Sequence, residues 1–406
     1  MDFSLSPEQQ RFRDDLRGWL HENLGDFAPS GRAQSAETAA PLETIGRRAQ
    51  VEIERGRAWQ RRLFEGGYAG ISWPREFGGR GGSIIEEMIF NQELAEAKTP
   101  PLINVIGLYM AGPTIIAHGT DAQKSRYLAP LLRCDEIWCQ GFSEPNSGSD
   151  LASLQTRAVR DGDRYVINGQ KVWTSLAHVA KWCILLTRTG GEKYGGLTYF
   201  IVDMESPGVE VKPLRQITGD AEFNEMFFTD VRVPAENILG SEGEGWRVAM
   251  TTLMHERASL GVGLQVRSRI ALEELRTLAR ATMEDGRSRA ADPLVRQRLA
   301  QLFIECEAMR FNGYRGLTRM LRGEQPGPEG SINKLMWSEV NQRIADAAME
   351  VMGPAAMLSP DDPDSPGEGR WSYLLLRSRA NSIEGGTSEV LRNILAERVL
   401  GLPRSR

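Results

Sequence analysis

Cysteine and histidine are scarce in this chain, which has four of each among its 406 residues. The four cysteines have no metal-like spacing: Cys134, Cys139, Cys183 and Cys306. The sequence therefore predicts neither a metal site nor a disulfide framework, and it is typical of a reducing compartment.

Long apolar runs and a strong net charge are also missing. No run approaches the ~20 apolar residues of a membrane-spanning helix, and a net charge of −5 suggests no nucleic-acid footprint. The N-terminal sequence MDFSLSPEQQ is polar and acidic, unlike a signal or transit peptide. We therefore expect a soluble, cytoplasmic protein with no membrane span and no nucleic-acid partner.

The order of hydrophobic periods predicts three domains in an α+β fold. Helical periods fill the chain up to about 134, period two runs from 137 to 233, and helical periods return after 245. We predict an N-terminal all-α domain at 1–134, a central small β-barrel domain at 135–240 and a C-terminal four-helix bundle at 241–406. No G-x-G-x-x-G follows a strand, which argues against a Rossmann nucleotide site.

Capping boxes predict where several helices begin. Ser6 with Gln9, and Ser83 with Glu86, have the spacing of a capping box, in which each side chain accepts a hydrogen bond from the other residue's backbone N–H. We also expect a helix after Thr120. The remaining predicted helices are about 42–64, 245–280, 293–322, 331–352 and 387–400.

The period-two region predicts short strands separated by turns. The strands are expected at 156–160, 165–167, 182–186, 197–202 and 225–228. Asn168-Gly169 is the strongest short hairpin signal in this region and predicts a turn there.

Two stretches of the β-region have residue types suited to a planar ligand. Residues 141–150 combine Pro, Asn, Gly and Ser, which fix tight turns and leave backbone N–H groups free. Trp173-Thr174-Ser175 sets a flat ring beside two hydroxyls. These residues alone leave two interpretations, a cofactor surface or a hairpin with a Ser-rich loop.

Three motifs follow one another along the chain. The first is Phe142-Ser143-Glu144-Pro145 followed by Gly148-Ser149-Asp150, and the second is the run from Asn168 to Ser175. The third is GGTSEVLRN at 385–393. In this order, the three resemble the signatures of the acyl-CoA dehydrogenase family. The resemblance covers nearly the whole chain, and it implies the same three-domain layout.

This resemblance implies an FAD-dependent enzyme of fatty acid or lipid metabolism, as in β-oxidation. Such an enzyme oxidises an acyl-CoA to the trans-2-enoyl-CoA: a carboxylate removes the α-proton while the β-hydrogen passes to flavin N5. The family further implies an electron-transferring flavoprotein as acceptor. It also implies a homotetramer built as a dimer of dimers, with a hetero-oligomer as the alternative.

Glu256 is the candidate base. It lies on an apolar helical stripe with Trp246, Ala249 and Leu253, where a carboxylate is costly unless paired or used. Taken alone, a structural ion pair with Arg257 explains it equally well. The resemblance favours catalysis, because His255-Glu256-Arg257 matches the base position of isovaleryl- and long-chain-type members.

The other subgroup of the family carries its base where this chain has Gly385. The resemblance therefore assigns Gly385 only a backbone N–H to the thioester carbonyl, and Glu384 becomes the runner-up base. The resemblance also assigns cofactor contacts to ten residues and substrate contacts to two. The cofactor-binding residues are Phe142, Ser143, Gly148, Ser149, Trp173, Ser175, Arg287, Gly353, Thr387 and Glu389, and the substrate-binding residues are Ser149 and Arg257.

One family motif is missing, and its absence leaves alternatives to the dehydrogenase function. The Arg-x-x-Phe-Gly between bundle helices, which contacts a neighbouring subunit's flavin, is replaced at best by Arg287-Ser288-Arg289. A non-catalytic partner subunit of a hetero-oligomer is therefore one alternative, and an acyl-CoA oxidase or flavin monooxygenase of the same fold is another. The sequence does not predict the length or branching of the acyl group. Gly261 and Gly263 leave space near Glu256 that permits a bulky one.

Overall fold

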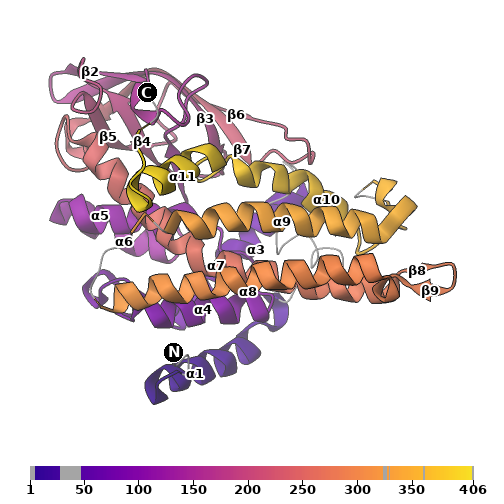
Figure 1. Cartoon of the computed structure of the whole chain (residues 1–406). Coiled ribbons are helices and arrows are strands. Elements are labelled where there is room, and N and C mark those ends of the chain that lie inside the picture. Colours follow the sequence, from indigo (N-terminus) through magenta and orange to yellow (C-terminus); the bar gives the residue numbers. More distant parts are fainter. Residues whose placement is uncertain (1–4, 28–46, 323–326, 329, 360–361, 405–406) are drawn as a thin grey trace. The chain divides into compact units, whose positions relative to one another are not determined.

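The computed structural model describes residues 5–27, 47–322, 327–328, 330–359 and 362–404, with backbone alone at 26, 47–51 and 256–262 (Figure 1). The chain divides into two compact units. We call residues 41–82 and 101–256 the sheet unit, and residues 1–40, 83–100 and 257–406 the bundle unit. The long helix α7 (Gly245–Ala281) begins in the first and continues into the second.

A seven-stranded sheet forms the centre of the sheet unit. Its strands are β1 (Trp138–Gly141), β2 (Arg157–Asp161), β3 (Arg164–Ser175), β4 (Trp182–Arg188), β5 (Leu197–Asp203), β6 (Val209–Pro213) and β7 (Phe223–Pro234). They pair in the order β1-β4-β2-β3-β7-β6, with β5 also on β4. The described pairings run from β1 to β6 without closing into a ring, so the predicted small barrel is a half-barrel.

Three helices of the sheet unit contribute side chains to a hydrophobic core that they share with β1, β4 and β5. They are α3 (Arg47–Glu65), α5 (Gly112–His118) and α6 (Asp121–Leu132). Tyr127 of α6 meets Trp138 of β1 and Trp182 of β4 edge to face, with ring centroids 5.4 and 5.0 Å away. β4 and β5 read as continuous apolar runs because both of their faces are buried.

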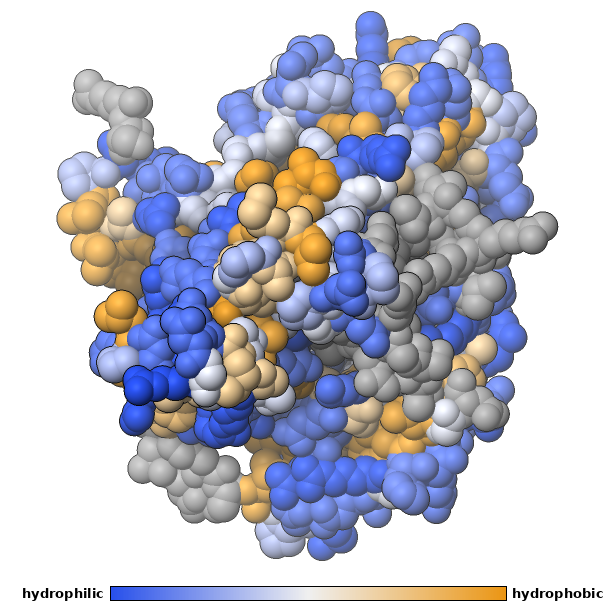
Figure 2. All heavy atoms as spheres, turned by 90° about the vertical axis from the view of Figure 1, so that its right-hand side faces the viewer, coloured by the Kyte–Doolittle hydropathy of each residue, from blue (hydrophilic) through white to orange (hydrophobic). Residues whose placement is uncertain are grey.

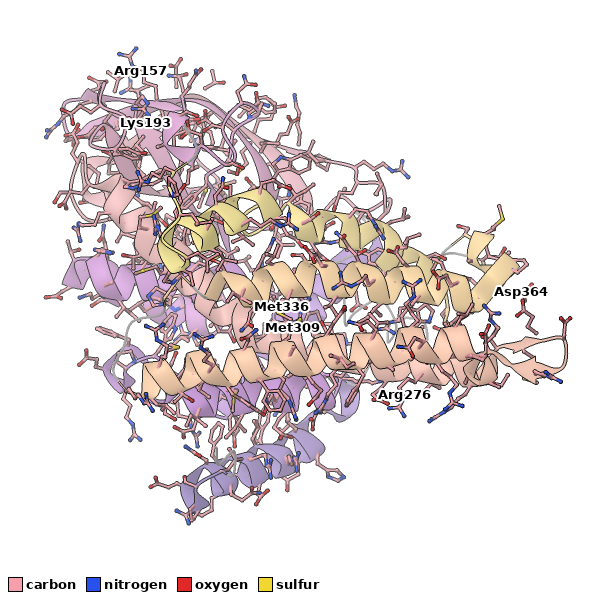
Figure 3. The ribbon with its side chains drawn as sticks, viewed as in Figure 1. Arg157, Lys193, Arg276, Met309, Met336 and Asp364 are labelled. Atoms are coloured by element: carbon pink, nitrogen blue, oxygen red, sulfur yellow. The ribbon has the colours of Figure 1, made fainter. Side chains whose placement is uncertain are left out.

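The bundle unit contains α1 (Pro7–Asn23), α4 (Ile84–Glu96), α8 (Pro293–Leu321), α9 (Gly330–Met352), α10 (Arg370–Ser378) and α11 (Ser388–Ile394). Its core is built from α7, α8, α9 and α10, and Met309 of α8 and Met336 of α9 lie between their helices (Figure 3). The fourth core helix is therefore α10, because Trp371 and Leu374 fill the bundle interior. The sequence does not single out α10. The fourth bundle helix that it predicts, at 387–400, corresponds to α11 and the π-helical segment Leu395–Val399 that continues it.

The predicted helix starts are confirmed. Ser6, Ser83 and Thr120 each accept a hydrogen bond from the backbone of the third helical residue, and each makes a capping box. The predicted helix at 42–64 corresponds to α3, and its first residues, 42–46, lie outside the described residues. The five predicted strands correspond to β2, β3, β4, β5 and β7, although β3 and β7 are much longer than expected.

The predicted turn at Asn168-Gly169 is wrong. Both residues lie inside β3, and the β2–β3 hairpin closes at Gly162-Asp163 instead. Gly169 has a φ of +153°, and a Cβ there would lie 2.7 Å from Thr156 Cα. Glycine is needed at this position for a close backbone approach at a register shift, which has the same local signature as a turn.

The surface mixes polar and apolar side chains (Figure 2). Several large apolar side chains of α8 are about half exposed, among them Phe303, Ile304 and Phe311. Within the described ranges, no helix is long and apolar enough to cross a membrane.

Candidate active site

The loop after β1 carries the first group of predicted site residues. Phe142 is buried, and its ring meets Tyr199 of β5 edge to face at 5.7 Å. Beyond it, Glu144 and Ser147 exchange backbone hydrogen bonds, so the chain turns tightly before Gly148 and Ser149. A Cβ added at Gly148 would meet nothing within 4 Å, so this part of the loop borders open space.

A buried ion pair fastens this loop to β3. Lys171 Nζ donates to Glu144 Oε1 at 2.8 Å and to the Phe142 carbonyl at 3.0 Å. Glu144 also accepts hydrogen bonds from the backbone of Gln155 (2.6 Å) and Thr156 (2.8 Å). Next to the pair, Val172 N–H donates to Ser143 O at 2.9 Å. The loop residues Phe142 and Ser143 are thereby held on the strand that carries Trp173 and Ser175.

Burial controls the charges of this pair. It lowers the pKa of the Lys171 ammonium to about 8, against the opposing effect of the Glu144 carboxylate. Burial also opposes ionisation of Glu144, but the charge and hydrogen bond of Lys171 outweigh it and hold the Glu144 pKa below its usual value. Both groups are therefore charged near neutral pH.

Trp173 is presented on the sheet surface by a local irregularity. The register between β3 and β7 shifts between Lys171 and Thr174, and Trp173 has a φ of +62°. Such a conformation is strained for a bulky residue and is found where other contacts impose it. Trp173 is 60% exposed, and its ring meets that of Phe223 of β7 edge to face. Ser175, two residues on, is half-buried on the same strand.

A chain of hydroxyls anchors the start of α7 within the sheet unit. Thr252 Oγ1 lies 2.9 Å from the Tyr199 hydroxyl and 2.9 Å from Thr114 Oγ1 of α5, and all three residues are fully buried. Glu256 follows Thr252 by one helical turn. The side chains of Glu256 and Arg257 lie outside the described residues, so their predicted roles stay predictions.

In the bundle unit, the remaining candidates cluster around the turn before α11. Gly385 and Gly386 have φ values of +62° and +97°, which only glycine adopts without strain. Glu384 receives two hydrogen bonds from Arg377 (2.9 and 3.2 Å) and one from Asn381 (2.7 Å). Its carboxylate is therefore the acceptor in a structural ion pair.

The other bundle residues are spread over three places. Thr387 caps α11 by accepting from Val390 N–H at 3.2 Å, and Glu389 in its first turn is 78% exposed. Gly353 follows α9 with a φ of +57°. Arg287 lies in the small hairpin of β8 (Met283–Glu284) and β9 (Arg287–Ser288).

Of the two arginines at the place of the missing family motif, Arg289 is engaged within this chain, whereas Arg287 is exposed. Arg289 pairs with Glu284, and it donates to the Glu350 carbonyl at 3.1 Å. Those contacts use both of its terminal nitrogens. Among the described residues, no group of three or more His, Cys, Asp or Glu side chains could hold a metal ion.

Sequence reasoning missed the buried residues that hold these turns. Lys171 and Glu144 lie within the motifs, but the sequence assigns them no role, and no motif or period points to Arg377. The alternation of β3 gives no signal here, because Lys171 and Val172 are both buried while Trp173 is exposed, across the register shift. The bulge itself has no signature in the sequence.

Comparisons with known proteins agree along the whole chain. Residues 6–135, 139–231 and 243–400 match the N-terminal, middle and C-terminal domains described for acyl-CoA dehydrogenases. The chain is 44% identical over 398 residues, 97% of its length and 98% of the relative's, to the acyl-CoA dehydrogenase IpdE1 of Mycobacterium tuberculosis. IpdE1 of Mycolicibacterium smegmatis is 43% identical, with 98% of each chain covered.

Two solved structures are similar over the full length of both chains. The ChsE4-ChsE5 complex from Mycobacterium tuberculosis gives a TM-score of 0.85 at 31% identity. The Tcur3481-Tcur3483 steroid ACAD gives 0.84 at 30% identity.

Proposed function

This chain belongs to the acyl-CoA dehydrogenase family and is an oxidoreductase of that type, and from this premise we propose how it works. It removes two hydrogens from the α and β carbons of an acyl-CoA with FAD as cofactor, leaving the trans-2-enoyl-CoA. The observation that carries this proposal is the surface formed by β3 and the loop after β1. There a strained, exposed Trp173 lies two residues from a lysine that holds the Phe142–Glu144 segment.

The residues of this surface suit FAD. Trp173 offers an uncovered flat ring, and Ser143 and Ser175 supply hydroxyls that can donate to or accept from ring nitrogens and carbonyls. Open space at Gly148 leaves room for a phosphate-bearing chain to approach the backbone. When bound, FAD supplies the hydride acceptor, a chemistry that no side chain offers.

The protein supplies the base and the oxyanion donor. Glu256 takes the α-proton, which is the role of a positioned carboxylate in this type of reaction. The Gly385 N–H donates to the thioester oxygen, where negative charge develops as the proton leaves. The ion pair of Glu384 with Arg377 supports Glu256 over Glu384, because the Glu384 carboxylate already accepts three hydrogen bonds.

Anaerobic titration of the FAD-loaded protein with a panel of acyl-CoAs tests this function. Loss of the oxidised flavin absorbance and formation of the 2-enoyl product are expected with at least one member of the panel. A protein that binds FAD yet stays yellow with every acyl-CoA, alone and with a partner chain, contradicts the proposal.

For the substrate, the panel must include ring-bearing acyl groups. One similar structure is described as a steroid ACAD, and this chain has glycine at 263, where an added Cβ would meet nothing within 4 Å. We therefore include a bulky, polycyclic acyl-CoA among the proposed substrates, next to straight-chain ones. An electron-transferring flavoprotein is the proposed acceptor, and turnover that produces stoichiometric hydrogen peroxide would indicate an oxidase instead.

Two oligomeric assemblies are compatible with this function, a homotetramer and a hetero-oligomer. A homotetramer, as a dimer of dimers, requires each chain to complete its neighbour's flavin site. The engagement of Arg289 with Glu284 and Glu350 within the chain supports a second arrangement, a hetero-oligomer with another family member, whereas the exposed Arg287 is compatible with either arrangement. Two similar solved structures carry paired names, ChsE4-ChsE5 and Tcur3481-Tcur3483. Sedimentation and flavin counting, with and without a co-expressed partner, decide between them.

A further inference from the structure

Lys334 makes two charged hydrogen bonds around the turn that carries Gly385. It lies near the start of α9, and its side chain is almost fully buried. Its Nζ donates to the Asn381 carbonyl at 2.7 Å and to the Gly386 carbonyl at 2.8 Å. One cation therefore holds the chain both before and after the Gly385 N–H.

The turn needs this anchorage because of its glycines. Gly385 and Gly386 both have positive φ, and glycine populates many other backbone conformations at little cost. An N–H that is to meet a developing oxyanion must be held in one orientation before the reaction. Glu384, whose carboxylate is bound by Arg377, restrains the turn only from its N-terminal side.

We propose that Lys334 is a positioning residue for the oxyanion donor. It fixes the orientation of the Gly385 N–H through the two carbonyls, and it places a positive charge beside the turn. A buried ammonium in a medium of low dielectric constant also favours negative charge on a nearby oxygen. This inference rests on the proposed function of Gly385.

The chain offers a matched control in Ser338, one helical turn after Lys334. Its hydroxyl donates to the same Asn381 carbonyl at 2.6 Å, but it carries no charge and makes no bond to Gly386 O. Ser338→Ala therefore removes one hydrogen bond from the turn. Lys334→Met removes the bonds to both carbonyls and the charge, and Lys334→Gln keeps donors without the charge.

The test uses a CoA thioester in which sulfur replaces the β-carbon. Such an analogue has an acidic α-C–H but no β-hydrogen to transfer, so its ionisation reports stabilisation of the enolate alone. In the FAD-loaded protein, we expect Lys334→Met to move this ionisation to higher pH. Its rate of flavin reduction by a substrate should fall about 10- to 100-fold, less than the 10²–10³-fold loss typical of an oxyanion donor itself. Ser338→Ala should leave the ionisation pH within a few tenths of wild type.

A merely structural lysine gives a different result. In that case Lys334→Met and Lys334→Gln lower the denaturation midpoint, but the folded variants ionise the analogue at the wild-type pH, and the inference is overturned. If Lys334→Gln ionises the analogue as wild type does, positioning by hydrogen bonds stands and the contribution of charge is refuted.

Failure of the proposed function is separable from failure of this inference. If the wild-type protein neither bleaches nor ionises the analogue, the assignment of Gly385 fails. Amide hydrogen exchange at residues 384–387 then decides the positioning role on its own. Faster exchange in Lys334→Met than in Ser338→Ala supports it, and equal exchange in all three proteins overturns it.

Discussion

Lys171 and Glu144 form an ion pair of 2.8 Å in which the lysine side chain has no exposed surface. Removing one partner of such a pair leaves a buried, uncompensated charge, which costs about 3–5 kcal/mol of folding free energy. We expect Lys171→Met to lower the free energy of unfolding by this amount and to weaken FAD binding, because the Phe142–Glu144 segment loses its anchor. Denaturant midpoints and the flavin content after gel filtration measure the two effects.

The control for this prediction is an exposed ion pair in the same sheet. Arg232 of β7 pairs with Asp161 of β2 at 2.9 Å, and both side chains are more than half exposed. Because water and salt screen such pairs, Arg232→Met should cost under about 1 kcal/mol and leave FAD in place. Equal losses in the two variants would show that the buried pair has no special role.

The lowered pKa of Lys171 predicts a pH dependence with a definite sign. Burial lowers this pKa to about 8 in the folded protein, against an ordinary value of 10.5. Between these two values the unfolded chain binds more protons at this site, so its contribution to the free energy of unfolding rises with pH. Arginine does not titrate in this window.

The difference between wild type and Lys171→Arg isolates this titration. As the pH rises from about 8 to 10, we expect the free energy of unfolding of the wild type to increase relative to that of the variant. Urea denaturation at a series of pH values measures the gain. Curves that stay parallel would mean that Lys171 keeps its ordinary pKa in the folded protein.

The sequence predicted the layout of the fold and the motifs, but not the contacts that hold the motifs. Capping boxes and hydrophobic periods are local signals, so Ser6, Ser83 and Thr120 were placed correctly. The partners of the Glu144 carboxylate and of the Asn381 carbonyl were not predictable in this way. Lys171 is 27 residues from Glu144, and Lys334 is 47 residues from Asn381, so only the tertiary fold brings them together.

The buried hydroxyl chain at α7 predicts that Thr252→Val destabilises the protein more than Tyr199→Phe does. Thr252→Val leaves the Tyr199 hydroxyl in a fully buried place without its partner, at a cost of about 1–3 kcal/mol. Tyr199→Phe costs less, because Thr252 still has Thr114 Oγ1 and the Val248 carbonyl as partners. Urea midpoints of the two variants test this order, and a larger loss for Tyr199→Phe would contradict it.

Gly169 shows why a turn signal failed and offers a prediction. A Cβ at this position would lie 2.7 Å from the backbone of Thr156, so Gly169→Ala must displace β2 from β3. We expect a loss of more than about 2 kcal/mol, as for other strained or overpacked substitutions. The control is Gly162→Ala at the real hairpin turn, where φ is +64° and nothing lies within 4 Å, so only about 1 kcal/mol of backbone strain is expected. Thermal or urea unfolding that ranks Gly162→Ala as the worse variant would contradict this explanation.

The last prediction concerns the base. Glu256 lies on α7 one turn after Thr252, whose hydroxyl contacts those of Tyr199 and Thr114, so the preceding turn of the helix is tied to β5 and α5. Glu384 lies in the turn before α11 with its carboxylate bound to Arg377 and Asn381. To act as the base, the Glu384 carboxylate would first have to give up hydrogen bonds to Arg377 and Asn381.

We therefore expect Glu256→Gln to keep FAD and bind acyl-CoA, yet to lose roughly 10²–10⁴-fold in the rate of flavin reduction, the usual contribution of a positioned base. Glu384→Gln should lower the free energy of unfolding, because Arg377 loses its carboxylate partner, while flavin reduction falls under about tenfold on the same scale. Stopped-flow bleaching at saturating substrate separates these outcomes from changes in binding. If Glu384→Gln abolishes bleaching and Glu256→Gln reduces flavin at the wild-type rate, the base is Glu384, and the ion pair with Arg377 must open during the reaction.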